Sequence, residues 1–84
     1  MKSESIRFPV YRKYKNNRSY FKILSLDSFV EVQAIGAKRI VHQINAKIYP
    51  EKLFIGDLLF RFEEMAVEIT ESEFDAEYKK VNKP

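Results

Sequence analysis

In the segment VYRKYKNNRSYFKI, residues 10–23, apolar and polar side chains alternate on either side of two asparagines. Alternation with a period of two is typical of β-strands with one buried face. Asparagine tolerates the positive φ angles of tight hairpin turns, so Asn16 and Asn17 predict a two-residue loop between antiparallel strands. In that register Val10 faces Ile23.

The two faces of this hairpin differ in chemistry, because successive strand residues point to opposite sides of a sheet. One face is apolar but for Arg12: Phe8, Val10, Arg12, Tyr14, Phe21 and Ile23. The other face, a candidate contact surface, combines cations and tyrosines: Tyr11, Lys13, Lys15, Arg18, Tyr20 and Lys22. Repulsion between Lys15 and Arg18 leaves a longer loop as the alternative, but the two faces do not depend on the register.

Further strands are predicted downstream of the hairpin. Residues 29–35 and 39–49 alternate between apolar and polar side chains, and residues 65–69 form a last short strand. Residues 53–62 fit either a helix or a strand. We expect a strand there, because Phe and Ile dominate and Gly56 would weaken a helix interior.

The C-terminal segment predicts a helix over residues 71–81. Thr70 and Glu73 have the spacing of a capping box, in which each side chain accepts a hydrogen bond from the backbone N–H of the other residue. An apolar stripe at helical spacing should dock this helix on the sheet. The stripe consists of Phe74, Tyr78 and Val81.

Together these elements predict an α+β fold: a small curved, mainly antiparallel sheet of about five strands with one C-terminal helix packed on a face. The 84 residues are expected to form a single domain, with a polar lead-in at 1–7, the sheet within 8–70 and the helix at 71–81. The absence of cysteine excludes disulfides and favours a cytoplasmic location. No apolar run approaches the roughly 20 residues of a membrane-spanning helix, so we expect no membrane association.

Motifs for catalysis and for cofactor binding are absent from the sequence, so we expect a non-enzymatic protein without a cofactor or a bound metal. His42 is the only histidine and stands in line with Ile40 and Ile44, which favours a structural role. The two glycines, Gly36 and Gly56, lie outside any glycine-rich phosphate-binding run, and no small-molecule substrate is implied.

Charge is distributed unevenly along the chain. Residues 1–24 hold seven Lys or Arg and one acid, whereas residues 51–84 hold five Lys or Arg and nine acids. The acidic helix could lie against the basic hairpin within one molecule, or the two ends could meet between subunits, and either arrangement would cancel the basic patch. Several large apolar residues are hard to bury together in so small a domain, which favours a contact surface. They are Leu24, Leu26, Phe29, Ile35, Phe54, Leu59 and Phe60.

We therefore expect a small binding or adaptor domain that acts through protein–protein contacts, with a protein partner or a second copy of itself. The alternative is a nucleic-acid-binding domain that uses the 10–23 hairpin. In that case Tyr11 and Tyr20 would stack on bases, and the cations would contact phosphates. These cations are Lys13, Lys15, Arg18 and Lys22.

Overall fold

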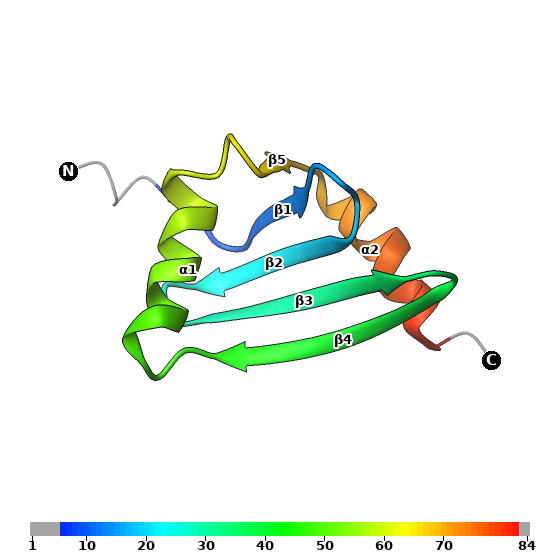
Figure 1. Ribbon diagram of the computed structural model, residues 1–84, viewed down its shortest axis with the longest axis horizontal. Coiled ribbons are helices and arrows are strands. Elements are labelled where there is room, and N and C mark those ends of the chain that lie inside the picture. Colours follow the sequence, from blue (N-terminus) through cyan, green and yellow to red (C-terminus); the bar gives the residue numbers. More distant parts are fainter. Residues whose placement is uncertain (1–5, 83–84) are drawn as a thin grey trace.

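The computed structural model describes residues 6–82 and shows an antiparallel sheet of five strands with two helices, an α+β fold (Figure 1). The strands are β1 (Val10–Tyr14), β2 (Ser19–Ser25), β3 (Ser28–Ile35), β4 (Lys38–Asn45) and β5 (Ala66–Glu68), in the order β4-β3-β2-β1-β5. The helices are α1 (Tyr49–Phe60) and α2 (Glu71–Lys79), and α2 continues into the 3₁₀ turn η2 (Lys80–Asn82). The polar lead-in predicted for residues 1–7 lies largely outside the described residues.

The hairpin of β1 and β2 has the predicted register. Val10 pairs with Ile23 and Lys13 pairs with Tyr20. Asn17 has a φ of +62°, in the left-handed region that asparagine tolerates and that most residues avoid. The side chain of Asn16 accepts a hydrogen bond from the Arg18 backbone N–H. The loop is longer than the predicted two residues, because β1 ends at Tyr14, β2 begins at Ser19 and the Asn17 N–H donates to the Tyr14 carbonyl oxygen at 2.9 Å. The longer loop keeps the predicted register, and both asparagines shape it.

The strand expected at residues 53–62 is wrong, because these residues belong mostly to α1. Pro50 lies in the first turn of that helix, where its fixed φ suits the helix and its missing N–H is not needed. β4 ends at Asn45, so the strand predicted over residues 39–49 is too long. Residues 6–82 thus form two helices instead of the one predicted, and the sheet is not strongly curled.

Each face of the sheet carries its own hydrophobic cluster, because neighbouring residues of β2 point to opposite sides. Phe21 and Ile23 pack with α1 on one face. On the other face, Tyr20 packs with Val32 of β3 and with Phe74 of α2. The two helices stand at opposite ends of the sheet (Figure 1). Each helix therefore covers only part of its face, and both faces of the sheet contribute buried residues.

Arg12, the charged residue on the apolar face of the hairpin, holds the C-terminal end of α1. Its Nε donates a hydrogen bond of 3.0 Å to the carbonyl oxygen of Leu58, and its guanidinium lies 4.1 Å from the centre of the Phe62 ring. Burial lowers the pKa of Arg12, although Glu68 and Glu63 act in the opposite direction. The guanidinium stays charged and complements the negative end of the helix dipole.

Candidate interaction surfaces

The acidic helix α2 lies on the basic face of the hairpin within one molecule. Thr70 caps the helix by accepting a hydrogen bond from the Glu73 N–H at 3.1 Å, as the capping box predicts. The Glu73 carboxylate does not complete the box but pairs with Lys13 Nζ at 2.9 Å. This hydrogen bond raises the pKa of Lys13. Lys13, one of the four cations predicted to bind phosphate, is therefore already paired with an acid of the same chain.

Both tyrosines of the basic face lie beneath α2. The rings of Tyr11 and Phe74 are 5.7 Å apart, and Tyr20 is only 7% exposed. Burial raises the pKa of Tyr11, and the nearby carboxylates of Glu71 and Asp75 raise it further. A base stacks on an aromatic ring only if one ring face is open. In this structure Phe74 occupies the space that a base would need.

A second ion pair anchors α2 to the edge strand β4. Arg39 Nε lies 2.7 Å from Glu77 Oε1, and the two side chains are 15% and 14% exposed. Lys80 Nζ reaches the other carboxylate oxygen at 3.2 Å. Burial alone would raise the pKa of Glu77, but the hydrogen bonds from Arg39 and Lys80 outweigh it and the pKa lies below its usual range.

The other predicted site residues lie apart from this covered region. Lys15 and Arg18 are exposed in the β1–β2 turn, and the structure records no ion pair for either among the described residues. Lys22 is half-buried beside a small groove that it lines with Leu24 and Asp75. The six residues therefore divide among a covered face, a turn and a groove, and their role as one contact surface stays a prediction.

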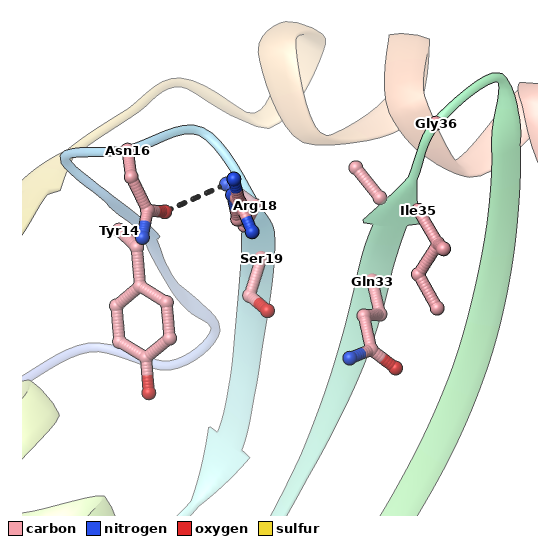
Figure 2. A pocket seen from close by; sticks show the side chains of 8 residues that line it. Tyr14, Asn16, Arg18, Ser19, Gln33, Ile35 and Gly36 are labelled. Carbon is pink, nitrogen blue, oxygen red and sulfur yellow. Dashed lines mark hydrogen bonds between the residues drawn. The ribbon is translucent and has the colours of Figure 1, made fainter.

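A shallow hollow lies between the β1–β2 turn and the end of β3 (Figure 2). Figure 2 shows Tyr14 and Asn16 on one side of Arg18 and Ser19, with Gln33 and Ile35 on the other. The residues that line it are Tyr14, Asn16, Arg18, Ser19, Gln33, Ala34, Ile35 and Gly36.

Two of the polar side chains that line this hollow are bonded to other side chains of the protein. Ser19 Oγ donates a hydrogen bond to Glu31 at 2.7 Å, and His42 Nε2 lies 2.9 Å from Gln33 Oε1. Burial raises the pKa of Tyr14, and the charge of Glu31 adds to the effect. Within residues 6–82 no buried side-chain polar atom lacks a hydrogen-bond partner. The hollow thus contains no buried side-chain polar atom without a partner, and His42 forms a hydrogen bond within the sheet.

The outer face of α1 is the surface that sequence reasoning missed. Tyr49, Leu53, Gly56 and Phe60 follow one another at helical spacing and form a row, which we call the α1 stripe. Tyr49 is 72% exposed, Leu53 is 42% exposed and Phe60 is 52% exposed. On the opposite side of the same helix, Ile55, Leu58 and Leu59 are buried in the core.

An apolar row on a helix is normally buried against a partner. In α1 the core supplies partners on one side, and the described residues supply none for the exposed parts of the stripe. Two charges flank the stripe. Lys52 is exposed on one side, and on the other Asp57 pairs with Arg61 at 2.7 Å along the helix. This arrangement, an apolar centre with a charged rim, is typical of protein contact surfaces.

The described residues do include several exposed large apolar side chains, but only some of them are the ones expected from the sequence. Among the residues named from the sequence, Phe60, Leu24, Leu26 and Ile35 are exposed. Phe29 and Leu59 are buried instead, and Phe54 is half-buried. Tyr49 and Leu53 were missed because their segment was assigned to strands. Spacings of four, three and four residues between Tyr49, Leu53, Gly56 and Phe60 were the signal that could have revealed the stripe.

Neither a candidate metal site nor a membrane-spanning helix occurs in the part of the chain that the structure describes. No three His, Cys, Asp or Glu side chains gather there as metal ligands would. No helix there is long and apolar enough to cross a bilayer. Comparison of the chain with protein-family models, curated proteins and solved structures gave no match.

Proposed function

We propose that this chain is a non-enzymatic binding domain that acts through protein–protein contacts in the cytoplasm, with the α1 stripe as its main contact surface. The observation that carries the proposal is a row of exposed apolar side chains on the solvent side of a helix whose other side is already buried in the core. Exposed apolar rows of this kind are uncommon on monomers and mark contact sites.

The composition of the stripe suits a contact. Large aromatic side chains dominate binding energy at interfaces, and Tyr49 and Phe60 stand at the two ends of the row. Complete burial of a large apolar side chain contributes about 1.5–3 kcal/mol. Because these side chains are about half exposed or more, a partner would gain about 1 kcal/mol from each.

The covered tyrosines favour this proposal over the nucleic-acid alternative. Tyr11 and Tyr20 would be its stacking platforms, and both lie against α2. Lys15 and Arg18 remain exposed, but two cations without an open ring supply few phosphate contacts and no base contact.

Two almost equally exposed leucines allow a matched test of the contact surface. Leu53 is 42% exposed in the stripe, and Leu24 is 43% exposed on β2, pointing to the opposite face of the sheet. We expect Leu53→Asp to remove the proteins that the tagged wild-type chain captures from cell extract, and Leu24→Asp to retain them. Both variants should keep the wild-type circular dichroism. If both variants capture the same proteins as the wild type, the stripe is not the contact surface.

A further inference from the structure

We propose that the partner of the α1 stripe is a second copy of this chain, whose α1 packs in parallel with the first in a symmetric dimer. This inference rests on the proposed function, because the same stripe provides the contact. Three features of α1 carry it: the spacing of the stripe, the charges on its two flanks and the glycine at its centre.

The spacing of the stripe is that of a helix–helix seam. Tyr49, Leu53, Gly56 and Phe60 occupy successive d, a, d and a positions of a heptad. Residues at these positions lie on one narrow side of a helix and face a single partner helix along its length. In a parallel pair related by a two-fold axis, each of them meets its own counterpart.

The flanking charges select the second copy and its direction. Lys52 takes the g position and Asp57 the e position that follows it five residues later. In parallel pairs, a g residue contacts the e residue five positions later on the other helix. Lys52 of each copy would therefore meet Asp57 of the other. In an antiparallel pair, g faces g and e faces e, so like charges would be brought together.

Both charged groups are available for this contact. The structure shows no ion pair for Lys52 among residues 6–82. Both hydrogen bonds that Arg61 donates to Asp57 end on Oδ1, so Oδ2 is left to receive Lys52 of the second copy. Asp57 would then contact two cations, Arg61 of its own chain and Lys52 of the second copy.

Gly56 has no reason inside its own domain to be glycine. It lies in a helix, and an added Cβ would meet no atom within 4 Å. Glycine weakens a helix interior, so its presence there is unfavourable unless another backbone must approach the helix closely. In the dimer it lets the two backbones approach between the Leu53 and Phe60 layers.

Sedimentation equilibrium of the full chain tests the dimer. A seam of four residues per copy is small, so we expect a dissociation constant of about 10–100 µM, measurable between about 5 and 500 µM chain. Leu53→Asp should weaken the dimer at least about tenfold, and Leu24→Asp should leave it unchanged. A wild-type chain that stays monomeric up to about 500 µM, or a dimer that tolerates Leu53→Asp, overturns the proposal.

Charge reversal tests the pairing of the flanks. Lys52→Asp and Asp57→Lys should each weaken the dimer by about three- to tenfold. The double variant Lys52→Asp with Asp57→Lys should recover most of the loss, because opposite charges again face each other. If the single variants bind as well as the wild type, or if the double variant is weaker than both, the proposed pairing is wrong.

Single cysteines test the direction independently, because the natural chain contains none. Tyr49→Cys and Phe60→Cys should each form a disulfide with its own kind under mild oxidation, since a parallel pair brings equal positions together. Leu24→Cys serves as the control for random collision and should remain reduced. Cross-links that form only when the Tyr49→Cys and Phe60→Cys chains are mixed would show an antiparallel pair and overturn the proposal.

The outcomes also separate this inference from the proposed function. If the chain is monomeric but Leu53→Asp still removes a protein that Leu24→Asp retains, the second copy is wrong and the contact surface stands. If Leu53→Asp affects neither self-association nor capture, both proposals fail.

Discussion

Arg39 and Glu77 show how a single ion pair joins distant parts of this chain. They are 38 residues apart in sequence, and each side chain is mostly shielded from water. Surface ion pairs contribute little because water screens them, but a shielded pair that also forms a hydrogen bond contributes more. Lys13 and Glu73 form a similar but more exposed contact at the other end of α2. The helix is therefore attached to both β1 and β4 by charge.

We expect Glu77→Gln to lower the free energy of unfolding by about 1–2 kcal/mol, because Arg39 and Lys80 lose a charged acceptor. Urea unfolding followed by circular dichroism measures this. Glu64→Gln is the control, because Glu64 is exposed and takes part in no ion pair that the structure records. Its effect should stay within about 0.5 kcal/mol. Equal effects of the two substitutions would contradict the role of Glu77.

The lowered pKa of Glu77 also predicts a pH dependence. A carboxyl whose pKa is lower in the folded state stabilises the fold above its unfolded-state pKa, about 4.3 for glutamate. This contribution is lost as the pH falls through the folded-state pKa. The stability difference between wild type and Glu77→Gln should therefore be constant at neutral pH and shrink as the pH falls below about 4. A difference that grows toward acid would contradict this prediction.

At the scale of elements, α1 and α2 are stabilised in different ways. α2 is polar, with Phe74 as its buried residue and charges that match the basic strands beneath it. α1 has apolar residues on both sides, and its attachment comes from the core. Since helix propensity is a weak preference, burial of Ile55, Leu58 and Leu59 overrides the presence of Gly56.

The two glycines provide a matched prediction for the elements that contain them. An added Cβ meets no atom within 4 Å at either position, but only Gly36 has a positive φ, of +59°. At chain concentrations where the protein is monomeric, Gly56→Ala should raise the free energy of unfolding by about 0.5–1 kcal/mol, through helix propensity. Gly36→Ala should lower it by about 1 kcal/mol, through backbone strain. Thermal unfolding distinguishes them, and a Gly56→Ala variant less stable than the wild type would contradict the prediction.

At the scale of the whole molecule, the sheet is the middle layer and each helix covers one end of one face (Figure 1). The described part is elongated, with extents of 45 × 24 × 21 Å. α2 covers part of the basic strand face, including Tyr11 and Tyr20, whereas the outer side of α1 is open. The fold thus covers part of the basic hairpin face that the sequence predicts as a contact surface, and it exposes the α1 stripe, which the sequence analysis did not predict.

This arrangement predicts the response to nucleic acid. In an NMR titration with single-stranded RNA, we expect any shifts within the 10–23 hairpin at low salt to be confined to Lys15 and Arg18 and to vanish at physiological salt, because the exposed cations of the hairpin offer only phosphate contacts. Tyr11 and Tyr20 should not move. Salt-resistant shifts at the two tyrosines would instead favour the nucleic-acid alternative and require α2 to leave the sheet.

Local patterns in the sequence determined the hairpin, its register and the start of α2. The alternation over residues 10–23, the φ preference of Asn17 and the cap at Thr70 each act between neighbours, so no distant contact is needed to predict them. Only the tertiary structure decided the rest. Residues 53–62 suit two conformations, and the sheet selected the helix by burying Ile55 and Leu58. Part of the basic face is covered by α2 through contacts such as that of Lys13 with Glu73, 60 residues away. A local pattern cannot determine which residues far apart in the sequence come into contact, because that depends on how all the apolar and charged groups are best paired at once.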